Sequence, residues 1–299
     1  MIERIVVPLD GSVTAEAVLP QIRRILHRAD SELVLVRAVV PAPSENSILL
    51  ADASTQAARE YLYGVQERLD RQGVRVESEV RVGSPTGVIL DVVDDRKATM
   101  VALATHGATG LRRLLMGSVA EALLRKSKVP VLAVRPFWTT DETPAPDAEI
   151  RPIRNLLLPV DGSDLSALVI PAALEFAGLF EGRAVLLRVL DPKKTTDEAA
   201  ERKEAEEHLQ GLAREFDRKG IETLLLVEKG DPVDEILKTA RFHGADLIAM
   251  TTHGRSGLGR LVTGSVTEEV LRRATTPLLV VRAEAPSKAR RRLAHAKRK

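Results

Sequence analysis

The sequence carries one 31-residue segment twice. Residues 105–135 and residues 252–282 align without a gap at an offset of 147 positions, and 17 of the 31 positions are identical. A gapless repeat of this length indicates two copies of a whole domain, because a solenoid would show several short units in series. The identical positions include glycines, a serine and a glutamate besides leucines and valines, so the segment contains loop and helix-end positions as well as core positions.

Two copies of about 150 residues match the usual size of one domain each. We place the first domain at residues 1–138, a proline-rich linker at 139–152, the second domain at 153–283 and a basic tail at 284–299. The apolar content of 44% suffices for two cores. Because aromatic residues make up only 3% of the chain, those cores must consist mainly of Leu, Val, Ile and Ala.

The composition also restricts the setting of the protein. The chain has no cysteine, so disulfides and thiolate metal sites are excluded and a reducing cytoplasm is the expected compartment. The first residues read directly into an apolar strand-like run, so we expect no signal peptide. No apolar segment approaches the roughly 20 residues that a membrane helix needs, so no membrane association is expected.

The charge is unevenly distributed along the chain. From position 286 onward there are seven Lys or Arg residues and no acid; subtracting them from the net charge of +2 leaves −5 for residues 1–285. A solvated, disordered tail is the favoured interpretation, and binding to an acidic surface or to nucleic acid is the alternative. The rest of the chain lacks basic runs interleaved with aromatics, so nucleic-acid binding is not expected.

Each half begins with an apolar run that ends in Pro-x-Asp-Gly-Ser, at residues 5–12 and 156–163. A run that is apolar on both faces is typical of a central strand in a parallel sheet, and the proline marks the end of that strand. Asp-Gly-Ser is a turn sequence, and Ser12 and Ser163 are predicted to cap the helices that follow.

The remaining elements recur in the same order in both halves. Helical spacing of apolar residues predicts a helix around Leu62 and another around Leu209, with Gly73 and Gly220 as their C-cap glycines. Further helices are predicted to begin at Ser84-Pro85 and Asp231-Pro232. The other strands are predicted at 33–39 and 184–190, 74–82 and 221–227, 100–104 and 246–250, and 129–134 and 277–281.

Alternating strands and helices predict an α/β protein of two tandem, open, parallel five-stranded sheets, each doubly wound and Rossmann-like. Ligands of such sheets bind beyond the carboxyl ends of the strands. Asp10 and Asp161 follow the first strands. Glycine loops follow the fourth strands, with sequences Thr105-His106-Gly107-x-x-Gly110 and Thr252-His253-Gly254-x-x-Gly257.

A capped helix is predicted directly after each glycine loop. The sequences Gly117-Ser118-Val119-Ala120-Glu121 and Gly264-Ser265-Val266-Thr267-Glu268 contain Ser-x-x-Glu, a capping box that predicts a helix starting at the serine. The free amides of such a helix carry partial positive charge, and the preceding glycine allows a ligand to approach closely. The pattern therefore predicts a phosphate site.

Other site types are not supported. His106 and His253 have no second histidine or carboxylate at metal-ligand spacing, so we interpret them as loop residues and predict no metal held by the protein. The chain has no Gly-x-x-x-x-Gly-Lys-Ser/Thr and no Gly-x-Gly-x-x-Gly after the first strand. It also has no Gly-x-Ser-x-Gly, which disfavours an α/β-hydrolase.

The chain resembles the universal stress protein family in its tandem two-domain form, over about residues 2–135 and 153–282. The resemblance is carried by the family's nucleotide motif, Gly-x-x-Gly, nine residues, then Gly-Ser: Gly107 and Gly254 are each followed by nine residues and then by Gly117-Ser118 or Gly264-Ser265. The motif's first glycine is replaced by Ala104 in one half. In the other half it is replaced by the bulkier, β-branched Thr251.

This resemblance implies that the chain binds ATP, with Mg²⁺, and leaves open whether both halves do so. Asp10 and Asp161 would lie near the ribose and the phosphates, and Val39 and Val189 would meet the adenine through their backbone. The glycine loops and helix starts would surround the triphosphate. The implied nucleotide site comprises Pro8, Asp10, Ser12, Val39, Ala104, Gly107, Gly110, Gly117, Ser118, Val119, Pro159, Asp161, Ser163, Val189, Thr251, Gly254, Arg255, Gly257, Gly264, Ser265 and Val266.

The resemblance also implies that the two halves pair through their last strands as a pseudo-dimer within one chain, with association of two chains and an unknown protein partner left open. The first functional hypothesis is an ATP-binding cytoplasmic protein of the stress response. The second is an interaction scaffold that binds no nucleotide. An ATP-using adenylating enzyme is the third; no positioned general base is visible, so we expect no enzyme activity beyond weak ATP hydrolysis.

Overall fold

The computed structural model describes residues 2–26, 31–41, 47–105, 116–136, 152–193, 196–253 and 264–283. The first half contains five strands and five helices in these residues: β1 Arg4–Pro8, α1 Val13–Glu16, α2 Leu19–Leu26, β2 Glu32–Val39, α3 Ser47–Asp70, β3 Val76–Val82, α4 Pro85–Asp95, β4 Met100–Ala104, α5 Ser118–Lys126 and β5 Val131–Val134. The second half repeats this order with β6 Asn155–Pro159, the 3₁₀ helix η1 Ser166–Val169, α6 Ile170–Phe180, β7 Arg183–Leu190, α7 Glu198–Asp217, β8 Thr223–Lys229, α8 Pro232–Phe242, β9 Leu247–His253, α9 Ser265–Arg273 and β10 Leu278–Ala283.

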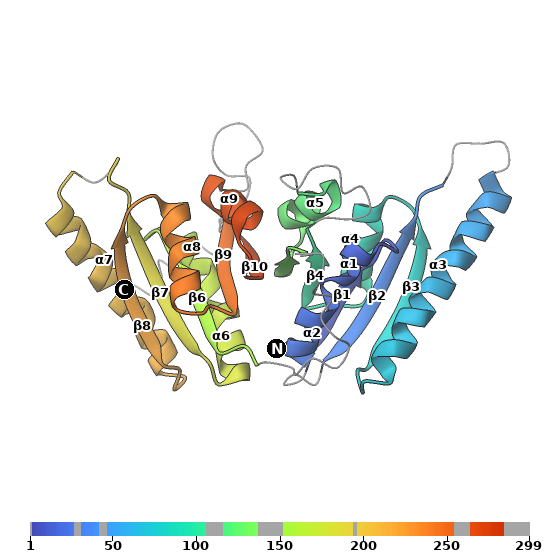
Figure 1. Ribbon diagram of the computed structural model, residues 1–299, viewed down its shortest axis with the longest axis horizontal. Coiled ribbons are helices and arrows are strands. Elements are labelled where there is room, and N and C mark those ends of the chain that lie inside the picture. Colours follow the sequence, from blue (N-terminus) through green and yellow to red (C-terminus); the bar gives the residue numbers. More distant parts are fainter. Residues whose placement is uncertain are drawn as a thin grey trace, which may run out of the picture.

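The strands of each half form the predicted parallel, doubly wound sheet, in the orders β3-β2-β1-β4-β5 and β8-β7-β6-β9-β10. The order reverses between β1 and β4 and between β6 and β9, which are therefore the two switch points. The two sheets are joined edge to edge, because β5 and β10 pair antiparallel, with Leu132 opposite Leu279. The result is one ten-stranded sheet with the two halves on either side of its centre (Figure 1).

Helices cover both faces of this sheet. One face packs against α2, α3, α6 and α7 through buried residues that include Ile22, Leu62, Phe176 and Phe216. The other face packs against α4, α5, α8 and α9. Each of these cores contains residues of β5 and β10, so the apolar interior is continuous between the halves. Figure 1 shows α3 and α7 at the two far ends of the molecule and α5 and α9 near its middle.

Several strands differ in length from the prediction. β9 extends to His253 rather than ending at position 250, and β10 extends to Ala283, because these two strands continue to pair with each other through Thr251 and Val281. β8 continues to Lys229, two residues further than predicted, alongside β7. Thr251 therefore lies inside a strand rather than in a loop.

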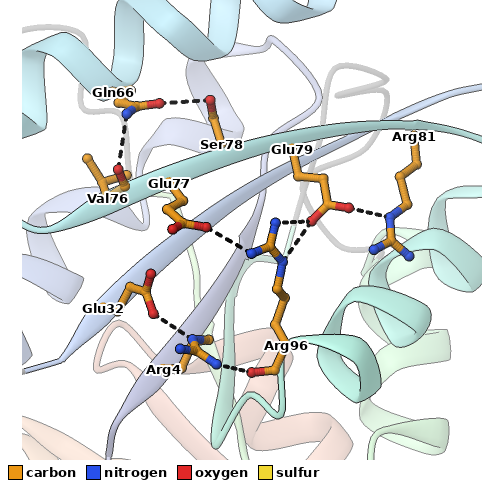
Figure 2. A network of polar contacts seen from close by, with 9 residues as sticks. All are labelled: Arg4, Glu32, Gln66, Val76, Glu77, Ser78, Glu79, Arg81 and Arg96. Carbon is orange, nitrogen blue, oxygen red and sulfur yellow. Dashed lines mark hydrogen bonds and ion pairs between the residues drawn. The ribbon is translucent and has the colours of Figure 1, made fainter.

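The outer edge strand β3 carries a network of charged side chains (Figure 2). Glu79 accepts from the Nε of Arg81 at 2.5 Å and from the Nε of Arg96 at 3.1 Å. Arg96 also pairs with Glu77 at 2.9 Å, and Arg81 with Asp95 at 2.8 Å. Charges on an edge strand oppose pairing with a further strand, so this network marks β3 as the end of the sheet.

Candidate functional site

The carboxyl end of β1 forms a tight turn around Asp10. The Oδ1 of Asp10 accepts hydrogen bonds from the backbone N of Ser12 at 2.9 Å and from its Oγ at 2.6 Å. The same Oγ accepts from the N of Ala15 at 3.1 Å, so Ser12 is the N-cap of α1, as predicted. The turn therefore holds the exposed carboxylate of Asp10 at the rim of the sheet beside the switch point.

The second half builds the matching turn at the end of β6. The Oδ1 of Asp161 accepts from the N and Oγ of Ser163 at 3.0 and 2.6 Å, and the Oγ of Ser163 accepts from the N of Ser166 at 3.1 Å. Burial by itself would raise the pKa of Asp161, but the hydrogen bonds from Ser163 and Ser166 and the nearby Arg188 guanidinium outweigh it and lower the pKa. The carboxylate is therefore held in its charged form.

The glycine of each turn has a left-handed backbone conformation, with φ of +87° at Gly11 and +82° at Gly162. Each glycine also lies against an arginine of the neighbouring strand. A Cβ placed on Gly11 would be 2.9 Å from the Nη1 of Arg37, and one on Gly162 would be 2.0 Å from the Nη1 of Arg188. The backbone angle therefore favours glycine at both positions, and the guanidinium would have to shift to admit a Cβ.

The helix after the fourth strand starts at the serine, as predicted, but the serine is not its N-cap. Gly117 is the N-cap of α5 and Ser118 is its first helical residue, and there is no side-chain hydrogen bond at this cap. The reason is that the carbonyl of Gly117 accepts the first intrahelical bond, from the N of Glu121 at 3.0 Å. The predicted capping box is therefore wrong, and among the described residues no side chain caps the first-turn amides.

α9 begins in the same way, with Gly264 as the N-cap, Ser265 as the first helical residue and no side-chain cap. Each helix start is fixed to the end of the neighbouring strand, but by different bonds. In the first half the N of Gly117 donates to the carbonyl of Thr105 at 2.8 Å. In the second half the Oγ1 of Thr267 donates to the carbonyl of Thr251 at 2.9 Å, and both threonines are buried.

The register of the second strands shows that Val39 and Val189, which were predicted as a matching pair, do not occupy equivalent positions in the two halves. Pro8 lies opposite Val36 and Pro159 opposite Leu187, so Val189 corresponds to Ala38 and not to Val39. The carbonyl of Val39 accepts from the N of Gly83 at 2.9 Å and thus faces β3. Since backbone groups alternate in direction along a strand, those of Ala38 and Val189 face the ends of β1 and β6.

Ala38 is therefore a candidate site position that the sequence interpretation missed. A signal for it was available, because the offset between the halves is 151 residues from Asp10 to Asp161, and this offset relates Ala38 to Val189. The offset becomes 147 only after the second strands, as Leu62 and Leu209 show. Arg37 and Arg188 were missed as well; each lies one residue before these positions.

The structure brings part of the predicted site together at each switch point. β1 and β4 are neighbours, as are β6 and β9, so the aspartate turn and the helix start lie at the same edge of the sheet in each half. The gathered residues are Pro8, Asp10, Ser12, Ala104, Gly117, Ser118 and Val119, and Pro159, Asp161, Ser163, Val189, Thr251, Gly264, Ser265 and Val266. The predicted Gly107, Gly110, Gly254, Arg255 and Gly257 lie outside the described residues.

These features define a doubly wound α/β protein with a candidate anion site at the switch point of each half. A profile of the universal stress protein family matches residues 1–135 and 152–282. The chain therefore belongs to the universal stress protein family.

Individual relatives agree with this assignment. A universal stress protein of Methanocaldococcus jannaschii is 33% identical over 140 residues, which cover 44% of this chain and 82% of that protein. One of Mycolicibacterium smegmatis is 26% identical over 299 residues, covering 93% and 96%. The crystal structure of a universal stress protein from Archaeoglobus fulgidus shares the fold over 95% of this chain and 100% of its own, with a TM-score of 0.74 at 22% identity.

Two kinds of feature are absent from the described residues. None of the helices in this part of the chain is both long and apolar enough to cross a membrane. Within the same residues, His, Asp and Glu side chains do not gather in groups of three or more that could hold a metal ion.

Proposed function

We propose that this protein binds ATP at the switch point of each half and acts in the cytoplasm in the stress response, through conformations that depend on the bound nucleotide. The observation that carries the proposal is the start of α5 and α9: a glycine N-cap leaves the first-turn amides without a side-chain cap, beside the end of the fourth strand. Uncapped helix amides next to glycine are suited to a phosphate.

The other site residues have roles that follow from their positions. Asp10 and Asp161 lie at the same edge of the sheet as the helix starts, where a carboxylate would accept from ribose hydroxyls or bind phosphate through a metal ion. Ala38 and Val189 present backbone groups that suit the edge of an adenine ring. Magnesium would arrive bound to the triphosphate, because Mg²⁺ commonly binds through one or two carboxylates and substrate phosphates rather than through an all-protein cage.

A nucleotide-independent scaffold is the second candidate, and one observation favours it for the second half. Thr251 replaces the first glycine of the nucleotide motif and lies buried within β9, where its carbonyl is bound by Thr267. Thr267 replaces Ala120 of the first half. This bond stiffens the end of β9, so we expect the first half to bind nucleotide more tightly than the second.

We expect no enzymatic turnover beyond slow ATP hydrolysis. The carboxylates at the rim, Asp10 and Asp161, are engaged by the serines of their own turns. The pKa of Asp161 is lowered, which makes that carboxylate a weak base. A general base needs a pKa near the working pH to accept a proton efficiently.

The test is isothermal titration calorimetry of the full chain, stripped of ligand, with ATP and Mg²⁺ at up to millimolar concentration. The decisive variants are Gly117→Val, Gly264→Val and the double variant. A Cβ at Gly117 would make only an ordinary contact, 3.4 Å from the carbonyl of Thr105, and its φ of −64° suits any residue. The variant should therefore fold but place methyl groups where a phosphate would approach.

The expected result is ATP binding by the unmodified chain and loss of one site in each single variant. Gly211→Val serves as the control for a glycine substitution, because a Cβ at Gly211, within α7, would meet nothing within 4 Å. If the double variant binds ATP as tightly as the parent, the helix starts are only helix caps. If the parent binds no ATP, the scaffold hypothesis is supported instead.

A further inference from the structure

An arginine from the second strand lies beneath the glycine of each Asp-Gly-Ser turn. The guanidinium of Arg37 on β2 lies against Gly11, and that of Arg188 on β7 lies against Gly162, so closely that it would have to move to admit a Cβ on the glycine. The two arginines occupy matching positions in the repeat, but the side chains that surround them differ between the halves.

In the first half the guanidinium is held by an aromatic ring. Arg37 lies over the ring of Tyr61, on α3, with its Cζ 5.1 Å from the ring centroid. The hydroxyl of Tyr61 donates to Glu16 at 2.9 Å, and Glu16 is also bound by Arg68. A cation over an aromatic face is attracted to it without needing a proton acceptor, so Arg37 is held by a series of contacts that runs through Tyr61 to Glu16 and Arg68.

In the second half, a nitrogen atom of the arginine and one of the residue at the position of Tyr61 lack hydrogen-bond partners among the described residues. His208 on α7 takes the position of Tyr61, since each directly precedes a fully buried leucine, Leu209 or Leu62. Among the described residues, the Nη1 of Arg188 and the Nδ1 of His208 are buried and have no hydrogen-bond partner. Buried nitrogen atoms without partners are costly, so this arrangement calls for an explanation.

Charged groups near His208 come from its own helix and from the elements packed against it. Arg188 of β7 and Asp161 of the turn act electrostatically on its ring, as does Glu204, one helical turn earlier on α7. On α6, which packs against α7, Glu175 has a buried carboxylate oxygen. β8 contributes Leu225 and Val227 to this face of the sheet, and Lys229 at its end pairs with Glu198 in the first turn of α7.

We propose that Arg37 and Arg188 are positioning residues that hold the Asp-Gly-Ser turns of the two nucleotide sites, and that His208 makes the second turn sensitive to pH while Tyr61 keeps the first turn insensitive. The effect on nucleotide binding rests on the proposed function. The coupling of Arg188 to His208 does not rest on it.

The direction of the effect follows from the charges. Burial lowers the pKa of His208 below its ordinary value of 6.5, and the Arg188 guanidinium lowers it further, whereas Asp161 and Glu204 act in the opposite direction. The ring is therefore neutral at pH 7. Protonation in acid places a second cation beside Arg188, which pushes the guanidinium away from Gly162 and loosens the turn around Asp161. Tyr61 stays neutral, because burial and its bond to Glu16 raise its pKa.

The first experiment does not depend on nucleotide. The pKa of His208 is measured by NMR titration of the full chain in the parent, in Arg188→Gln and in Arg37→Gln. Loss of Arg188 should raise the pKa of His208, because it removes a neighbouring cation. Loss of Arg37, the matched control in the other half, should leave it unchanged. An unchanged pKa in Arg188→Gln would overturn the proposal, whatever the protein binds.

The second experiment measures ATP affinity at pH 7.5 and 5.5 in a chain whose first site is blocked by Gly117→Val. With His208 present, affinity should fall about tenfold more at the lower pH than in the His208→Tyr variant, which copies the first half. Comparing the two variants removes the effect of protonating ATP itself. Equal pH dependence in both variants would overturn the proposed effect on binding.

The reciprocal variant completes the design. In a chain whose second site is blocked by Gly264→Val, Tyr61→His should introduce pH dependence at the first site, and failure to do so would count against the role of this position. If no variant binds ATP at any pH, the proposed function fails, while the NMR titration still decides whether Arg188 and His208 are coupled.

Discussion

The guanidinium of Arg282, on β10, donates a hydrogen bond to the carbonyl oxygen of Lys126, at the end of α5 in the other half, over 3.1 Å. The matching residue Arg135, directly after β5, donates to the carbonyl oxygen of Arg272 in the last turn of α9. Each half thus supplies a cation to the negative end of the helix whose other end forms the candidate phosphate site of its neighbour.

We expect the double variant Arg135→Gln, Arg282→Gln to lower the free energy of unfolding by about 1 kcal/mol, because two helix C-termini lose a charged partner. Urea denaturation followed by circular dichroism measures the change. Arg125→Gln is the matched control, since it removes a cation from the same helix but breaks only a 3.9 Å pair with Glu121. Equal losses in the double variant and in the control would show that the contacts between the halves contribute nothing.

A second contact between the halves centres on Asp246. Its Oδ1 accepts from Arg24 of α2 at 2.6 Å, and its Oδ2 accepts from the backbone N of Arg154 and of Asn155 at 2.9 and 3.1 Å. Asp246→Asn should cost about 2 kcal/mol, because the amide keeps one acceptor and loses the charge. Asp234→Asn, which breaks the exposed pair with Arg273 within one half, should cost far less in the same denaturation experiment.

The ion network on β3 should contribute to stability in a salt-dependent way. Glu79 joins Arg81 and Arg96, and only 19% of its side chain is exposed. We expect Glu79→Gln to lower the stability by about 1 kcal/mol at low ionic strength and by less in 1 M salt, where charges are screened. Asp94→Asn, at an exposed pair with Lys128, provides the comparison. A salt-independent loss in Glu79→Gln would mean that packing rather than charge is responsible.

The stability of the chain should depend on pH through His208. Because the folded state lowers the pKa of this residue below the ordinary 6.5, the unfolded chain binds the proton more readily. Stability is therefore unaffected well above pH 6.5 and is lost as the pH falls below it. The midpoint of urea unfolding should drop more between pH 7.5 and 5.5 in the parent than in His208→Tyr. Identical drops would contradict the lowered pKa.

Local patterns in the sequence predicted the elements of the fold well. The apolar spacing around Leu62 and Leu209 correctly predicts the long helices α3 and α7. The pair Asp231-Pro232 correctly predicts the start of α8, with Asp231 as the side-chain N-cap and Pro232 as the first helical residue. These signals are local, because helix periodicity and cap chemistry act over a few residues. The edge-to-edge joining of the two sheets was predicted only through the family resemblance, because the residues of β5 and β10 by themselves do not indicate which strand each one pairs with.

The contacts that define the site were less predictable. Ser118 matches the capping-box pattern, yet the carbonyl of Gly117 takes the first helical bond and shifts the cap by one residue. The contact of Arg188 with Gly162 joins residues on different elements, and the proposed coupling of Arg188 to His208 adds a third element. Such contacts depend on the register between strands and on the packing of a helix against the sheet, neither of which a local pattern contains.

The antiparallel pairing of β5 with β10 would also form in a symmetric dimer of two separate single-domain chains. In that dimer every residue would occur identically on both sides, so a histidine facing one arginine would face the other as well. Linking the copies covalently removes this identity, and Tyr61 and His208 can differ within one molecule. One tandem molecule can therefore carry a half that is proposed to respond to pH, through His208, beside a half that is not, through Tyr61. The two halves are always present at equal concentration and experience the same pH.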